Sequence, residues 1–137
     1  MPPDDARVDD TRAWLKRAAE DLRAADHGLV AQPPLLGDAA FHCQQTVEKA
    51  LKALLAWHDT PFRKTRSLEE LGEAVLRLDG TLHSVIDRAA VLSEYAWKYR
   101  YPGDEAEPTA EETRRALALA REVYAAVLSR LPPQAAP

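Results

Sequence analysis

The residues best suited to chemistry lie in one stretch, from Phe41 to His58, where polar side chains recur at helical spacing. At about 100° per residue, Gln45, Lys49 and Lys52 point to one side of a helix, outside its apolar face. Because an ammonium or amide group on an open helix side can hold a phosphate, we interpret these three as candidate phosphate-binding residues. The alternative is that the lysines form solvated pairs with helix acids, as Glu48 and Lys52 would at a spacing of four residues.

Two further polar residues of this stretch, Gln44 and Glu48, fall along the margin of the apolar face. A buried amide or carboxylate without a hydrogen-bond partner costs about 1–3 kcal/mol. We therefore expect both side chains to find partners, either on a neighbouring helix or on a second subunit. The apolar face is formed by Ala40, Cys43, Val47, Ala50, Leu51 and Leu54.

A second candidate site lies at Arg100 and Tyr101, where an aromatic-rich segment ends. An arginine beside aromatic rings can clamp a phosphate while a base stacks on a ring. The alternative is a structural arginine that complements the negative end of a helix. A short basic loop over residues 62–66 is a further source of positive charge.

Other chemistries find little support in the sequence. The single cysteine, Cys43, lies on the apolar side of its predicted helix and is expected to be a small core residue. No glycine-rich turn follows a strand pattern, which excludes phosphate-loop and dinucleotide-binding folds. We predict no catalytic residue, no metal site and no cofactor. The histidines offer no pair at ligand spacing along one helix; they are His27, His42, His58 and His83.

Composition favours one helical domain. The chain has 137 residues, of which 46% are hydrophobic and only 5 are glycine, a balance typical of packed helices. The net charge of −4 argues against a nucleic-acid binder that works by bulk electrostatics. No apolar run reaches the ~18 residues of a membrane span, and the first residues lack the features of a signal peptide. We expect a cytoplasmic protein.

The apolar periodicity predicts an all-α fold: an up-down antiparallel four-helix bundle with an additional short helix. Ser67 and Thr109 open two capping boxes, each with a glutamate three residues later. We expect a disordered N-terminal tail over residues 1–8, one domain over residues 9–131 and a disordered tail over residues 132–137. The five predicted helices cover residues 9–30, 38–60, 67–78, 81–101 and 109–131.

Three segments of the chain resemble the signature of HEPN domains, which are nucleotide-binding domains of prokaryotes and higher eukaryotes. They are residues 44–52 (QQTVEKALK), residues 65–71 (TRSLEEL) and residues 100–102 (RYP). The resemblance spans most of the chain, from about Trp14 to about Val127. It implies a five-helix bundle, frequent homodimerisation, ATP or RNA as ligand, and a minimal nucleotidyltransferase as partner.

The resemblance also implies which residues bind. It transfers a binding role to Gln45, Lys49, Lys52, Arg100 and Tyr101, the residues that match the family pattern. Many members are ribonucleases or toxins in which an arginine, followed after four to six residues by a histidine, acts on the 2′-hydroxyl of RNA.

This chain departs from that ribonuclease pattern. No histidine follows Arg100. Arg77 and His83 have the right spacing, but Asp79 and Gly80 break the helix between them, and we interpret this pair as accidental.

Three functions remain open from the sequence. The first is a non-catalytic nucleotide-binding or RNA-binding module that acts with a minimal nucleotidyltransferase in a toxin–antitoxin-like system. The second is a metal-independent ribonuclease toxin, which needs His83 or another base beside an arginine in a groove. The third is a helical scaffold without a nucleotide ligand. We also expect a homodimer, because a bundle of this size is too small to bury all of its large apolar side chains. These include Phe41, Trp57, Trp97 and Tyr99.

Overall fold

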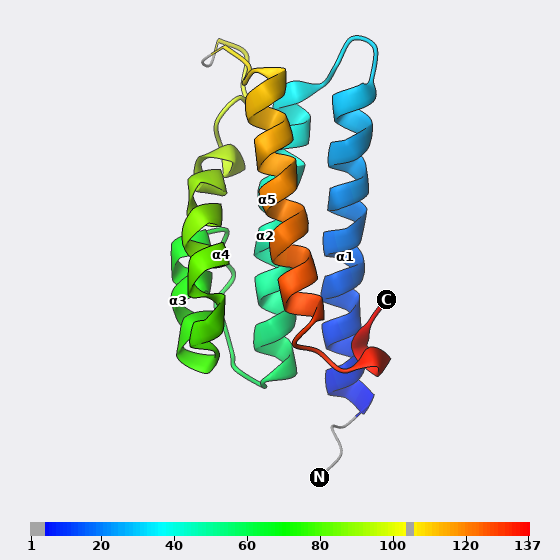
Figure 1. Ribbon diagram of the computed structural model, residues 1–137, viewed down its shortest axis with the longest axis vertical. Helices are drawn as coiled ribbons and strands as arrows, with labels where there is room; N and C mark the ends of the chain where they lie inside the picture. Colours follow the sequence, from blue (N-terminus) through cyan, green and yellow to red (C-terminus); the bar gives the residue numbers. More distant parts are fainter. Residues whose placement is uncertain (1–4, 104–105) are drawn as a thin grey trace.

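A computed structural model of the chain describes residues 5–103 and 106–137. Within this part the fold is all-helical, with five α-helices and no strand, which confirms the predicted fold class (Figure 1). The α-helices are α1 (Asp5–Val30), α2 (Leu36–Trp57), α3 (Leu68–Leu78), α4 (His83–Ala89) and α5 (Ala110–Leu128). Three 3₁₀ segments accompany them: η1 (Gly80–Leu82), η2 (Ala90–Ala96) and η3 (Pro133–Ala135).

The four helices α1, α2, α4 and α5 alternate in direction, whereas the short helix α3 runs in the same direction as α2 (Figure 1). α1, α2 and α5 lie side by side, while α4 with η2 runs up beside α5 and α3 packs outside as the short extra helix (Figure 1). α2 contacts α1, α5, α3 and η2, so it is enclosed by other elements on most sides. A helix in this position is expected to be apolar over most of its circumference.

The core follows the predicted apolar face of α2. Its residues on that face are almost without exposed surface, and burying each leucine contributes about 1.5–3 kcal/mol. α1 adds Leu15, Ala18 and Ala25, and α5 adds Ala120, Val123 and Val127. The α2 residues of the core are Ala40, Cys43, Val47, Ala50, Leu51 and Leu54.

Both predicted helix caps are present. The side chain of Ser67 accepts a hydrogen bond from the amide of Glu70 at the start of α3, and Thr109 does the same for Glu112 at the start of α5. The return bond of the α3 capping box differs from the prediction, because the amide of Ser67 donates to the hydroxyl of Thr65 instead.

The predicted helix over residues 81–101 is divided in the structure. It becomes η1, α4 and η2, and helical structure ends at Ala96. The backbone of Tyr99 lies in the left-handed region, with φ 66°, which no continuing α-helix allows. Arg100 therefore lies in the connection after the helix and does not close it.

The first and last helices have bounds that differ from the predicted ones, and residues 1–4 of the predicted N-terminal tail lie outside the described residues. α1 begins at Asp5, earlier than predicted, and α5 ends at Leu128. Residues 133–135 form η3, with Ala135 buried, and Arg12 of α1 donates hydrogen bonds to two carbonyls of this terminal segment. No helix among the described residues has the length and apolar character needed to cross a membrane.

Candidate functional site

Four polar side chains of α2 form a closed hydrogen-bond network, which we call the inner seam: Gln44, Gln45, Glu48 and Lys52. The amide of Gln45 donates to Gln44 Oε1 at 2.6 Å and to Glu48 Oε2 at 2.8 Å. Lys52 Nζ donates to Glu48 Oε1 at 2.8 Å. Gln44 Nε2 donates to the backbone carbonyl of Arg66 at 3.1 Å, so the partners of Gln44 and Glu48 lie within the same chain.

The inner seam is buried, and the prediction that Gln45 and Lys52 lie on an open side of the helix is wrong. Gln45 and Lys52 are each 6% exposed. The ammonium of Lys52 lies 5.2 Å from the ring centre of Trp14 and 5.8 Å from that of Phe62. The reason is long-range packing, because α1 and the loop before α3 cover this side of α2.

A second polar group lies nearer the surface, where α1 meets α2. Asp21 of α1 accepts from Lys49 Nζ at 2.6 Å, and its other oxygen lies 2.7 Å from His42 Nδ1. Burial raises the pKa of the Asp21 carboxyl, but the hydrogen bonds from His42 and Lys49 outweigh it and leave the pKa below its usual value. Lys49 is partly exposed, and its ammonium group is bound to the carboxylate of Asp21.

Arg100, in the connection before α5, packs against the first turns of α2. We call this surface the arginine face and define it by Phe41, Arg66 and Arg100. The guanidinium carbon of Arg100 is 3.9 Å from the ring centre of Phe41, and that of Arg66 is 5.8 Å from the same centre. Arg100 also approaches Asp38, with 3.9 Å between Nη1 and Oδ1.

Gly37 allows this arrangement. A Cβ atom at Gly37 would lie 3.3 Å from Tyr99 Cβ, a tight contact that would push the two segments apart by a few tenths of an ångström, so glycine favours the close approach of the connection before α5 to the first turn of α2. This approach sets Arg100, the next residue, above the ring of Phe41.

His42 borders the arginine face, which the sequence analysis did not anticipate. Its Nδ1 is bound to Asp21, and its Nε2 lies 3.5 Å from Asp38 Oδ2, the carboxylate that Arg100 approaches through the other oxygen. His42 precedes Arg66 and Arg100 in the chain, so it does not fit the ribonuclease pattern of an arginine followed by a histidine. The spacing of four residues between Asp38 and His42 indicates that these two side chains meet on one helix face. The second partner of His42, Asp21 in α1, could not be predicted from local spacing.

The five predicted binding residues share one side of α2 without meeting at one point. Arg100 lies over Phe41, and Phe41 and Lys52 are 11 residues apart, so about 16 Å separates the two ends along the helix. Tyr101 follows Arg100 with 72% of its surface exposed. Gln45 and Lys52 lie beneath the surface, and Lys49 lies at the α1 edge.

Arg77 and His83, the pair with ribonuclease spacing, line different cavities. Arg77 borders one beside Phe62, and His83 borders another between α3 and α4. Cys43 is buried, and this raises the pKa of its thiol to about 12, as suits a core residue. Among residues 5–103 and 106–137, no group of three or more histidine, cysteine or acidic side chains is arranged to hold a metal ion.

Comparison with known proteins gives one match. A family model described as HEPN domain matches residues 11–131, which is most of the chain. No curated protein and no solved structure matches the chain. The matched region contains both the inner seam and the arginine face.

Proposed function

Since this chain belongs to the HEPN domain family, we propose that it binds a nucleotide or RNA, with the arginine face as the phosphate-binding surface. The family match suggests a function related to nucleotides or RNA. The proposal goes further by assigning the contact to Arg66 and Arg100, with Phe41 as an aromatic platform. In this role the inner seam is the buried support of the site rather than its ligand-binding part.

One observation carries the proposal: two guanidinium groups lie over the same phenyl ring and remain available to a ligand. Arg66 makes no ion pair with any acidic side chain in the described part of the chain. Arg100 has an exposed carboxylate at 3.9 Å, a separation at which surface pairs contribute about 0–1 kcal/mol. A phosphate bound to either guanidinium would gain charge-assisted, bidentate hydrogen bonds, and at Arg100 it would displace the weakly held Asp38.

The test is binding of a fluorescein-labelled single-stranded RNA, followed by anisotropy at several salt concentrations. Arg100→Ala should weaken binding about tenfold and reduce the salt slope by about one phosphate contact. The matched control is Arg115→Ala, which removes an exposed arginine of α5 that pairs with Glu111 on the same helix. Equal affinity of Arg100→Ala and Arg115→Ala would leave the arginine face without a role.

A second candidate is the metal-independent ribonuclease, and His42 is the observation that favours it. A histidine whose Nδ1 is fixed by a carboxylate keeps its Nε2 positioned toward neighbouring groups, and this is how a general base is usually held. If the chain cleaves RNA, His42→Asn should abolish turnover while leaving RNA affinity nearly unchanged. Cleavage that survives His42→Asn excludes this residue as the base.

Partnership with a minimal nucleotidyltransferase in a toxin–antitoxin-like system rests on the family alone. Co-expression with a nucleotidyltransferase encoded beside this chain, followed by size-exclusion chromatography, tests it. We expect the two proteins to elute together. Separate elution at micromolar concentration would contradict the partnership and would leave the ligand proposal standing.

A further inference from the structure

A groove with an apolar floor and an acidic rim is lined by residues of α3 and α4. These two helices lie across the bundle from α1 (Figure 1). Its volume is about 180 Å³. This is below the ~300–1,000 Å³ of typical small-molecule pockets, and it suits one or two side chains of another protein. The floor is formed by Leu68, Gly72, Leu76, Ile86 and Ala90.

Gly72 sets the shape of the groove. A Cβ atom at this position would lie 2.8 Å from Ile86 Cγ2, a distance that real Cβ atoms do not tolerate. The missing side chain at Gly72 leaves room for Ile86, which forms part of the floor. The groove is thus a feature of rigid helix packing and not of a loop.

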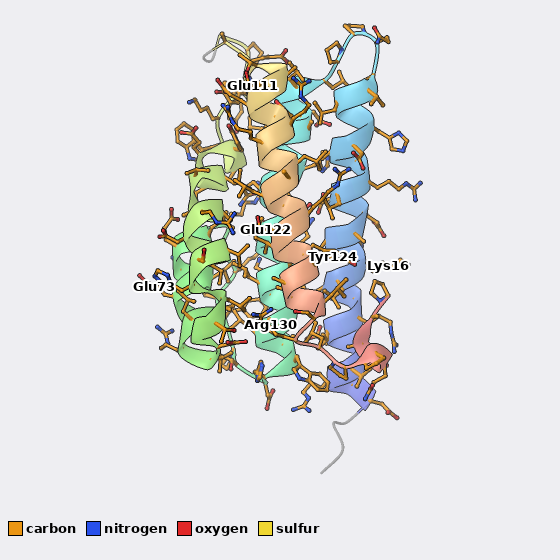
Figure 2. All side chains as sticks on the ribbon, in the orientation of Figure 1. Lys16, Glu73, Glu111, Glu122, Tyr124 and Arg130 are labelled. Carbon is orange, nitrogen blue, oxygen red and sulfur yellow. The ribbon has the colours of Figure 1, made fainter. Side chains whose placement is uncertain are left out.

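Three carboxylates surround this floor: Glu69 and Glu73 on α3 and Asp87 on α4. None of them forms an ion pair with a basic side chain that the structure describes, whereas Glu122 of α5 is bound to Arg88 on the other side of α4. Figure 2 shows Glu73 on the outer edge of α3, directed away from the bundle.

The positive charge near α3 lies on its opposite side. Arg63 and Arg77 line a separate cavity beside Phe62, together with Glu70, which is ion-paired with Arg63. Glu69 is held in place by Ser93, whose hydroxyl donates to its two oxygens at 3.0 and 3.1 Å. His83 is the remaining titratable side chain of the groove, and none of its lining residues is lysine or arginine.

We propose that this groove docks a cationic amphipathic helix of a partner protein, with an aliphatic side chain on the apolar floor and lysine or arginine residues against Glu69, Glu73 and Asp87. Charge complementarity selects this occupant, because unpaired carboxylates around an apolar strip match a helix with a basic face. The groove is separate from the arginine face and opposite in charge. One chain therefore presents an anion-binding surface and a protein-binding surface at once.

The experiment uses the full chain and a display library of randomised helical peptides of about 20 residues, a length of roughly five to six turns. Wild-type protein serves as bait, and the Glu69→Lys/Glu73→Lys variant serves for counter-selection. The enriched peptides should carry aliphatic residues at i and i+4 with flanking lysine or arginine. Enrichment of another pattern, or no enrichment, overturns the proposal.

The best enriched peptide is then labelled and titrated by fluorescence anisotropy. Glu69→Lys/Glu73→Lys should weaken its binding at least about tenfold, and higher salt should weaken binding to the wild type. The matched control is Glu20→Lys, an exposed charge reversal on α1, which should leave affinity unchanged. Circular dichroism verifies that each variant is folded.

Two further outcomes contradict the proposal. Equal affinity of the Glu20→Lys and Glu69→Lys/Glu73→Lys proteins would move the peptide away from the groove. A dimer in sedimentation that dissociates in the Glu69→Lys/Glu73→Lys variant would identify a second copy of this chain as the occupant instead.

Discussion

Lys52 and Arg100 carry the same charge and were assigned the same role from the sequence, but their surroundings differ. The side chain of Lys52 is 7% exposed and is bound to Glu48, between two aromatic rings. The side chain of Arg100 is 37% exposed, lies over the ring of Phe41 alone, and approaches the Asp38 carboxylate only to 3.9 Å. A cation already desolvated and paired has little to offer a ligand, whereas an exposed arginine on an aromatic platform can exchange a weak partner for a phosphate.

The inner seam predicts a large effect of Lys52→Met on stability. Removing the ammonium leaves Glu48 buried without its cation, which should lower the free energy of unfolding by about 3–5 kcal/mol. Urea denaturation followed by circular dichroism measures this. Lys16→Met is the control, because Lys16 is exposed and such surface changes stay within about 0.5 kcal/mol. Similar midpoints for Lys52→Met and Lys16→Met would show that the seam is not a stabilising element.

Asp21 predicts how stability depends on pH. Its pKa is lowered in the folded state, so its ionised form stabilises the fold at neutral pH. This contribution should disappear as the pH falls from about 4, the pKa of aspartate in the unfolded chain, through the lower pKa of Asp21 in the folded protein. The stability difference between wild type and Asp21→Asn should therefore be largest above about pH 5 and shrink toward acid.

The control for this measurement is Asp26→Asn. Asp26 is an exposed carboxylate five residues further along α1, where it pairs with Arg121. This variant gives the effect of removing a carboxylate that is exposed on the same helix. A stability difference for Asp21→Asn that grows toward acid would reverse the assigned sign of the linkage.

At the scale of elements, the close packing of α3 against α4 depends on a single missing side chain. Gly72 faces Ile86 at a distance that leaves no room for a Cβ atom. Overpacked positions of this kind usually cost about 1–3 kcal/mol, because neighbouring side chains and backbone must move.

We expect Gly72→Ala to lower the free energy of unfolding by about 1–3 kcal/mol, despite the better helix propensity of alanine. Adding Ile86→Leu removes the Cγ2 atom that the new methyl group would meet, and it should restore part of the loss. Thermal unfolding of the single and double variants measures both effects. A Gly72→Ala protein more stable than wild type would show that the contact relaxes freely.

The elements differ in how far the sequence predicts them. The starts of α3 and α5 were predictable because Ser67 and Thr109 act on amides only three residues away. The division between α4 and η2 was not, since the apolar repeat continues through Val85, Ala89 and Leu92. The spacing of apolar residues indicates which face is buried. It does not distinguish an α-helix from a 3₁₀ helix in segments as short as α4 and η2.

The site was less predictable than the fold because it depends on contacts between distant segments. Arg66 reaches Phe41 from the loop before α3, and Arg100 reaches it from the connection before α5. Asp21 meets His42 from a different helix. Local spacing identifies the polar side of α2 but cannot say which of its residues other segments cover.

The whole molecule leaves apolar surface uncovered along η2. Val91 is 65% exposed and Trp97 is 63% exposed, both on or just after η2. Exposed aromatic side chains of this size often mark protein contacts. We therefore maintain the homodimer as a proposal and assign its contact to this region.

Sedimentation velocity at micromolar concentration should show a dimer for the wild type and a monomer for Trp97→Ser. Val30→Ser is the control, because Val30 is exposed to a similar degree, at 72%, but belongs to α1. A wild-type monomer, or dissociation by both substitutions, would contradict this assignment.

The central proposal is that phosphate binds at the arginine face. Its most direct test is a titration of the ¹⁵N-labelled protein with single-stranded RNA, observed at the arginine side-chain Nε–H resonances. The account predicts that the Arg66 and Arg100 resonances shift together with one dissociation constant, while that of Arg88, paired with Glu122 on α5, stays in place. Shifts confined to other arginines, with Arg66 and Arg100 unmoved at saturation, would contradict it.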